Sequence, residues 1–348
     1  MMKGQKRNMF DQADANPFIT TVFMGYMMSK AMGAALRDEK VQKLIHSDEK
    51  FDVVLVEQFM NNAEKALATH FGAPLVVVSA LGANVWSNAL VGNPAPLSYI
   101  PLVTTDYSFP MTFCQRVLNS LLYVVTEVFF NLFVHPVENE VIKKYIPNGP
   151  DLSDVLYNAS IVLMNSHPSI HQPVPYVPNM IEVGGFHVTP PKKLPEDLQE
   201  FLDGAKDGVI YFSMGSNLKS ADFPPEKRDA ILRTFSKLKE KVLWKWEEDV
   251  LPGQPDNVKL SKWLPQQSIL AHPNVKLFIT HGGLLSTTET VYHGVPILAI
   301  TVFGDQKLNA RSAMNNGFGL MLPYNEVTED RFTQSIQEIL NNPKYDNL

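Results

Sequence analysis

The chain has 348 residues, which at ~150 residues per domain suits two domains better than one. Its content of 45% hydrophobic and 19% charged residues is typical of a globular protein, and a formal net charge of −6 argues against a nucleic-acid binder, which needs a basic face. The single cysteine, Cys114, excludes an intrachain disulfide and a cysteine-based metal site.

The start of the chain and its most apolar run both bear on membranes. Residues 1–18 lack the apolar core of a signal peptide. The run from Val117 to Val134 is long enough to span a bilayer, but Glu127 near its centre would be costly in hydrocarbon. We therefore expect a buried or surface-lying amphipathic helix here, and the sequence predicts neither a signal peptide nor a transmembrane anchor.

In the first half of the chain, predicted helices alternate with apolar strands. In order, the sequence predicts a helix over 29–47, a strand over 51–56 that ends at Glu57, a helix over 61–72, a strand over 73–80, the apolar helix, and a strand over 159–166. This alternation predicts a parallel sheet covered on both faces.

A proline-rich stretch separates the two halves. Residues 168–195 hold seven of the 25 prolines, a density that resists regular structure and indicates a boundary near residue 185. The alternation then restarts, with strands predicted over 208–217, 241–246, 276–280 and 295–301 and helices over 225–240, 285–293 and 326–342. The sequence therefore predicts two α/β units, residues 1–185 and residues 186–348.

One turn in the second half has the composition of an anion site. The sequence FITHGGLLSTTE predicts a strand that ends at Thr280 and places His281 at the carboxyl edge of the sheet, where open α/β sheets bind ligands. Gly282 and Gly283 let the backbone approach a ligand, and the following helix offers free N–H groups with a partial positive charge. The turn thus predicts a phosphate cradle.

The first turn of that helix adds two polar side chains. Ser286 can donate a hydroxyl, and Glu289 lies three residues on, hence on the same face, where it suits a pair of ribose hydroxyls. Alternatively, the glycines form an ordinary turn, Ser286 caps the helix and Glu289 is a solvated charge. Taken alone, the turn leaves both interpretations open.

The flanking segments favour the functional interpretation. Trp263 offers a flat ring on which a base can stack, and Gln266 can reach the polar edge of that base. Asp305 and Gln306, at the end of the next strand, supply an acceptor and a donor for sugar hydroxyls. Together these groups match the parts of a nucleotide sugar.

The tract from Trp263 to Gln306 resembles the donor-binding signature of the UDP-glycosyltransferase family, and its details are most similar to the insect members. The motif is F-I-T-H-G-G…S…E…G-V-P-I-L…D-Q, and the resemblance extends to FDVVLVEQF, NSHPSI, VGGFHVTPPKKLP and YFSMGSN, across essentially the whole chain. One departure is Thr301, where the family usually has a backbone-stiffening proline.

The resemblance implies a GT-B-like α/β fold, with two Rossmann-like parallel-sheet domains that face each other across a cleft. Residues 1–185 would be an incomplete acceptor-binding domain that lacks the first strand–helix units. Residues 186–348 would be the UDP-sugar donor-binding domain, without the family's last helices and membrane anchor. The chain would therefore be a member shortened at both ends.

The resemblance also assigns roles to residues. It implies that Trp263 stacks on uracil, Gln266 helps to hold the uridine and Glu289 binds the ribose. The residues implied at the diphosphate are Ser213, Gly215, Ser216, His281, Gly283 and Ser286, and those at the transferred sugar are Asp305 and Gln306. For Ser213 and Ser216, ordinary loop polarity is the alternative. No metal is implied, and the sequence has no D-x-D pair, so protein groups would have to neutralise the diphosphate.

Family chemistry is an inverting displacement in which a histidine takes the proton of the acceptor hydroxyl and a carboxylate orients that histidine. The carboxylate corresponds to Glu57, which could instead be a solvated residue at a strand end. His46 is the one histidine before Glu57, and it belongs to the helix that leads into the strand, so no histidine occupies the place of the base.

Two hypotheses about function follow. The first is an enzyme that transfers a hexose, glucose rather than glucuronic acid, from a UDP-sugar to a small lipophilic acceptor, as in detoxification. The second is a non-catalytic UDP-sugar binder that acts as a regulatory partner of related transferases. An NAD(P) dehydrogenase is disfavoured because G-x-G-x-x-G is absent. The resemblance implies homo- or hetero-oligomers and, for a full-length parent, an anchored protein of the endoplasmic reticulum lumen.

Overall fold

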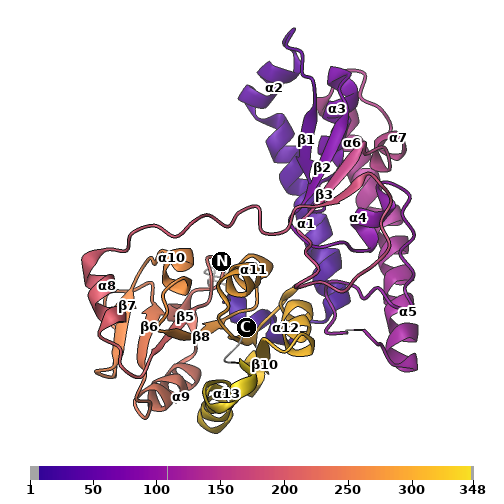
Figure 1. Ribbon diagram of the computed structural model, residues 1–348. Helices are drawn as coiled ribbons and strands as arrows, with labels where there is room; N and C mark the ends of the chain where they lie inside the picture. Colours follow the sequence, from indigo (N-terminus) through magenta and orange to yellow (C-terminus); the bar gives the residue numbers. More distant parts are fainter. Residues whose placement is uncertain (1–7, 108, 346–348) are drawn as a thin grey trace, which may run out of the picture. The chain divides into compact units, whose positions relative to one another are not determined.

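Apolar strands build one parallel sheet in each half of the chain (Figure 1). The computed structural model describes residues 8–107 and 109–345. A four-stranded sheet has the order β1-β2-β3-β4, and a six-stranded sheet has the order β10-β9-β8-β5-β6-β7. The paired strands of both sheets are parallel, which confirms the predicted α/β class.

The four-stranded sheet belongs to a compact unit formed by Asn16–Gly184. Its helices and strands are α1 (Pro17–Arg37), α2 (Glu39–Ile45), β1 (Val54–Glu57), α3 (Ala66–Phe71), β2 (Leu75–Ser79), α4 (Val85–Ala89), α5 (Phe113–Phe129), α6 (His135–Tyr145), α7 (Leu152–Leu156), β3 (Ile161–Met164) and β4 (Met180–Glu182). Strand β4 lies in the proline-rich stretch, where we expected no regular structure. Met180 pairs with Val162 of β3 there, so the stretch closes the sheet before the chain leaves the unit.

The helix predicted over 29–47 is in fact two helices. Helix α1 begins earlier, at Pro17, and ends at Arg37. Asp38 then leaves the helical conformation, and its side chain accepts a hydrogen bond from the backbone N–H of Lys40 at 2.9 Å. Aspartate is a favourable residue at this N-cap position, which explains why a new helix starts there.

Helix α5 carries the most apolar run of the chain. Its inner face holds the buried Asn119, whose amide nitrogen donates to two backbone oxygens at 2.9 Å. Its outer face exposes Leu121, Val124 and Val128. Among the described residues, one helical run, Phe113–Tyr145, is long and apolar enough to cross a membrane by length and composition, and 22% of its most apolar window is buried. Helix α5 is therefore amphipathic and lies at the surface of its unit.

The six-stranded sheet belongs to the second unit, which begins at Gly185, one residue before the predicted boundary. Its helices and strands are α8 (Glu196–Asp203), β5 (Val209–Ser213), α9 (Pro225–Phe235), β6 (Lys241–Lys245), β7 (Val258–Ser261), α10 (Gln266–Leu270), β8 (Val275–Thr280), α11 (Leu284–His293), β9 (Ile297–Thr301), α12 (Gln306–Asn315), β10 (Gly319–Pro323) and α13 (Glu329–Asn341).

Strand β5 shows why this sheet is stable. Ile210 and Phe212 pack into the apolar cluster on one face, and Val209 and Tyr211 pack into the cluster on the other. None of the four is more than 1% exposed. Because successive side chains of a strand point to opposite faces, a continuous apolar run is what a sheet covered by helices on both faces requires.

The start of the chain does not belong to the unit to which we assigned it. Residues 8–15 pack with the second unit, not with Asn16–Gly184. Phe10 is 2% exposed, and its ring stacks on Phe223 at 4.5 Å and on Tyr324 at 4.8 Å between ring centres. This aromatic stack is a contact between distant parts of the sequence, so local patterns gave no sign of it.

Candidate functional site

The predicted donor-binding residues follow strands that end at one edge of the six-stranded sheet. Strand β5 ends at Ser213, β8 at Thr280 and β9 at Thr301. Ser213 and Thr280 pair in register, and the strands are parallel, so the loops that follow them leave from the same edge. The structure therefore brings the glycine turns after β5 and β8 close to the loop that carries Asp305. Such an edge is where open α/β sheets bind ligands.

The imidazole of His281 lies between two glycines. A Cβ atom on Gly215 would be 2.6 Å from His281 Cε1, and a Cβ atom on Gly283 would be 2.5 Å from His281 Nε2. The ring therefore occupies the space that a side chain at either position would need. Gly215 also has a φ angle of 82°, which L-residues with a side chain rarely adopt. Both glycines are required to seat the ring.

His281 is neutral near pH 7. Burial of the ring, and secondarily the positive charge of Lys245, lower the pKa of His281 to about 4. The imidazole can therefore form hydrogen bonds with a diphosphate, but it does not supply a positive charge. The sequence predicts His281 as a diphosphate ligand, and its lowered pKa indicates that it would act as a neutral hydrogen-bonding group.

Gln266, Ser286 and Glu289 form one hydrogen-bonded network between α10 and α11. Gln266 Nε2 donates to Ser286 Oγ at 3.0 Å and to Glu289 Oε2 at 2.6 Å. The hydroxyl of Tyr211 donates to Gln266 Oε1 at 3.2 Å. Glu289 is 7% exposed, so the alternative in which it is a solvated charge is wrong. The structure joins the residues predicted for the uridine, the diphosphate and the ribose.

Two residues that the sequence analysis missed hold the other oxygen of Glu289. Gln267 Nε2 donates to Glu289 Oε1 at 3.1 Å, and His187 Nε2 lies 3.5 Å from the same oxygen. Burial raises the pKa of Glu289, but hydrogen bonds from His187, Gln266 and Gln267 outweigh it and leave this pKa below its ordinary value. The carboxylate is therefore ionised and held in one orientation. The doubled glutamine in LPQQS was the available signal for Gln267.

Asp305 and Gln306 are fixed by their own loop. Asn309 Nδ2 donates to Asp305 Oδ2 at 2.7 Å and to the carbonyl oxygen of Gly282 at 3.0 Å, and so ties this loop to the glycine turn. Burial raises the pKa of Asp305. The amide oxygen of Gln306 accepts two backbone N–H groups of the loop, at 2.8 and 3.1 Å. It therefore shapes the loop, and the amide nitrogen is the group of Gln306 suited to meet a sugar.

Trp263 and the two loop serines differ in what they can contact. Trp263 is 74% exposed, so its indole is free to stack on a base. Ser213 is 1% exposed, and its hydroxyl accepts a hydrogen bond from the backbone N–H of Gly215 at 3.3 Å. Ser216 is exposed. Of the two serines, Ser213 supports the turn and Ser216 is available to a ligand.

Glu57, the predicted partner of a general base, lies in the other unit. It ends the edge strand β1, and its side chain is exposed. Within residues 8–107 and 109–345, no hydrogen bond joins Glu57 to a histidine. His46 Nδ1 and His70 Nε2 instead contact the backbone oxygens of Gln42 and Ile45, at 2.9 and 2.7 Å.

Comparison with known proteins bears on the whole chain. The model of the family described as UDP-glucoronosyl and UDP-glucosyl transferase matches residues 5–348. The UDP-glycosyltransferase UGT5 of Dactylopius coccus is 41% identical over 307 residues, which cover 88% of this chain and 58% of that protein. UDP-glucosyltransferase 2 of the same insect is 34% identical over 300 residues, or 86% of this chain and 58% of that protein. The chain thus spans somewhat more than half the length of these relatives.

Solved structures of low identity share the fold. The glycotransferase of kitacinnamycin has a TM-score of 0.63 at 17% identity, covering 93% of this chain and 77% of that one. The UDP-glucose: anthocyanidin 3-O-glucosyltransferase, solved with UDP, has a TM-score of 0.59 at 18% identity, covering 88% and 71%. These likenesses show the predicted GT-B fold with its two parallel-sheet domains. Because the family model matches almost the entire sequence and insect relatives exceed 30% identity, the chain belongs to the UDP-glucuronosyl and UDP-glucosyl transferase family.

Proposed function

We propose that the unit beginning at Gly185 binds a UDP-sugar, and that the protein acts in inverting, metal-independent transfer of the hexose to a hydroxyl of a small lipophilic acceptor. The observation that carries the proposal is the network of Gln266, Ser286 and Glu289 beside the seated ring of His281. In the complex, Glu289 would accept the ribose hydroxyls, His281 and the N-terminus of α11 would meet the diphosphate, and Asp305 would meet the sugar.

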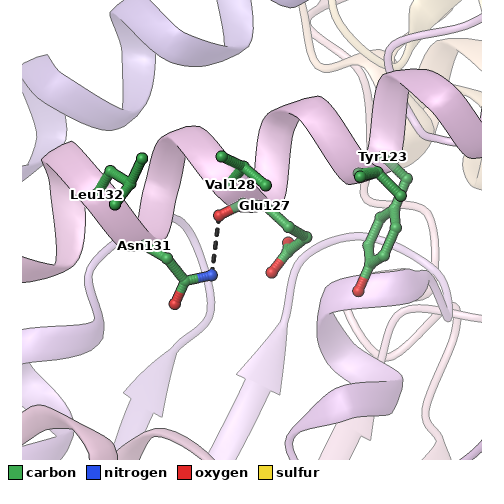
Figure 2. Close-up of a pocket in the computed structure, with 6 residues that line it drawn as sticks. Tyr123, Glu127, Val128, Asn131 and Leu132 are labelled. Carbon is green, nitrogen blue, oxygen red and sulfur yellow. Dashed lines mark hydrogen bonds between the residues drawn. The ribbon is translucent and has the colours of Figure 1, made fainter.

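For the acceptor, we propose the Asn16–Gly184 unit, where a pocket of about 410 Å³ lies against α5 (Figure 2). Figure 2 shows Tyr123 and Glu127 on the same side of the helix. Trp86 Nε1 donates to Glu127 Oε1 at 3.2 Å, and burial raises the pKa of Glu127. A mostly apolar lining with one carboxylate acceptor suits a lipophilic molecule that carries a hydroxyl. The lining residues are Tyr123, Val124, Glu127, Val128, Asn131 and Leu132.

A second candidate function is a UDP-sugar binder without turnover that regulates related transferases. The exposed Glu57, to which no histidine among the described residues is hydrogen-bonded, favours this candidate. The donor site is common to both candidates, so they differ only in whether bound donor is used.

For the whole protein we propose the location and partners expected from the family. These are the endoplasmic reticulum lumen, a membrane anchor, oligomers with itself or with related transferases, and a role in conjugating lipophilic compounds. The family match over residues 5–348 supports them. Fractionation of cells that express the protein tests the location, because an anchored lumenal protein sediments with microsomes and is protected from added protease.

The two candidate functions are separated by measuring UDP-glucose binding and acceptor glucosylation on one preparation. Binding with transfer supports the enzyme, whereas binding without transfer supports the regulatory binder. A preparation that binds no UDP-sugar contradicts both. The proposal that the transferred sugar is glucose is supported by a relative named UDP-glucosyltransferase 2. Titration with UDP-glucuronic acid tests it, because a glucose-specific site should bind this donor more weakly than UDP-glucose.

Trp263 offers a sharp test of the uridine position. Replacing Trp263 with alanine is expected to weaken UDP binding by about 1–3 kcal/mol, the usual value of one base–aromatic stack. Since 74% of the residue is exposed, the thermal unfolding midpoint should not change. Calorimetric titration with UDP and a melting curve measure the two effects, and Trp263→Phe should retain most of the affinity. A variant that melts earlier but binds normally would contradict the assignment.

A further inference from the structure

Lys245 is a buried cation at the donor-binding edge of the sheet. It is the last residue of β6 and is 8% exposed. Its Nζ donates to the carbonyl oxygen of Gly215 at 2.8 Å and to Glu247 Oε1 at 3.1 Å. Lysine is rarely buried this deeply, and an ammonium group has three N–H donors, so these two bonds leave one donor for another acceptor.

Segments of the proposed donor site surround this ammonium group. The carbonyl of Gly215 belongs to the turn after β5, and the same glycine lies against the ring of His281. The positive charge of Lys245 contributes to the lowered pKa of His281. Nζ also lies 5.9 Å from the centre of the Trp263 ring. The positive charge therefore lies at the turn after β5 and near the ring proposed for uracil.

The charge balance of the site calls for such a group. Glu289 is ionised, His281 is neutral, the carboxylate of Glu247 contacts Lys245, and a UDP-sugar adds two negatively charged phosphates. The N-terminus of α11 contributes only a partial charge, equivalent to about +0.5. A full positive charge close to the phosphates is needed to offset this excess, and charge-assisted hydrogen bonds to phosphate are among the strong ones.

We propose that Lys245 is a donor-binding residue whose ammonium group neutralises the diphosphate of the UDP-sugar. Glu247 positions it, because Glu247 Oε2 accepts the backbone N–H of Ala221 at 3.1 Å while Oε1 holds Nζ. The inference rests on the proposed donor site and adds the residue that supplies its positive charge.

The test is calorimetric titration of wild type and Lys245→Gln with uridine, UMP and UDP. The loss of one charged hydrogen bond predicts that Lys245→Gln binds UDP roughly 10- to 30-fold more weakly. The loss of affinity for UMP, which carries one phosphate, should be smaller. Uridine, which carries none, should bind with unchanged affinity. Lys245→Arg keeps the charge and should retain most of the affinity for UDP, which separates a role of the charge from a failure to fold.

Lys259→Gln is the matched control. It removes the same charge from the neighbouring strand β7, where Lys259 Nζ pairs with Asp197 Oδ2 at 2.8 Å, and UDP affinity should not change. An equal loss for uridine and UDP in Lys245→Gln would assign Lys245 a structural role and overturn the proposal, as would unchanged UDP affinity. A wild type that binds neither uridine nor UDP would overturn the donor site itself.

Discussion

Replacing Glu289 with alanine is expected to weaken UDP binding about 100-fold, because two charge-assisted hydrogen bonds to ribose hydroxyls are lost. The carboxylate is ionised and held by Gln266, Gln267 and His187, so in the proposed complex it would already be oriented before the ribose binds. Calorimetric titration with UDP and with 2′,3′-dideoxy-UDP measures the effect. Wild type should strongly prefer UDP, and Glu289→Ala should bind both nucleotides with the same low affinity.

Glu329 provides the control for this prediction. Its carboxylate lies on α13 and pairs with Arg233 and Lys237, and with none of the residues proposed for the donor site. Glu329→Ala should therefore leave both affinities unchanged. If Glu289→Ala kept the wild-type preference for UDP over the dideoxy nucleotide, Glu289 would not be the ribose ligand.

Replacing Lys65 with methionine is expected to destabilise the Asn16–Gly184 unit by about 1–3 kcal/mol, because it leaves the buried amide oxygen of Asn62 without its donor and Glu138 without a nearby positive charge. Lys65 and Glu138 are both 0% exposed. Lys65 Nζ donates to Asn62 Oδ1 at 2.8 Å, and Asn62 Nδ2 donates to Glu138 Oε2 at 3.2 Å. Burial lowers the pKa of Lys65 to about 7 and raises that of Glu138 to about 7.

The pH dependence of this loss has a definite sign. In the variant, Glu138 no longer has the cation that favours its charged form, so its folded pKa lies even further above the unfolded value. Such a group costs stability progressively as pH rises from the unfolded pKa of 4.5 to the folded pKa, and the cost disappears below the unfolded value. Urea unfolding should therefore show a much smaller loss near pH 5 than near pH 8.

A double variant tests whether the pair is the cause. Lys65→Met combined with Glu138→Leu removes both charges and should recover most of the stability at high pH, because a buried pair can often be replaced by apolar residues. Equal destabilisation of Lys65→Met near pH 5 and near pH 8 would show that lost packing, rather than the uncompensated carboxylate, dominates.

The sequence predicted the second sheet well where its strands are buried on both faces. β5, β8 and β9 are continuous apolar runs, and each was expected within a few residues of its observed bounds. Because ligands bind at the carboxyl ends of parallel strands, the residues that follow β8 and β9 were then predicted as site residues, and these include His281 and Asp305. The short strands β7 and β10 were missed. Apolar and polar residues alternate in the four residues of β7, whereas β10 is a short apolar run, Gly319–Pro323, that was not recognised as a strand.

The contacts that complete the candidate site were beyond the reach of local patterns. His187 meets Glu289 across 102 positions of sequence, and Lys245 meets Gly215 across 30. These segments become neighbours only through the order of the strands in the sheet, and that order cannot be predicted from local patterns in a single sequence. The same holds for residues 8–15, whose Phe10 packs against side chains more than 200 positions away.

Hydrogen–deuterium exchange with and without UDP-glucose tests the central claim most directly, because it reports which segments the donor covers. If the carboxyl edge of the six-stranded sheet is the donor site, peptides spanning residues 211–218, 263–270 and 281–289 should exchange more slowly when the donor is present. Peptides of α13 should not change. Protection confined to other segments, or no protection at saturating UDP-glucose, would contradict the account.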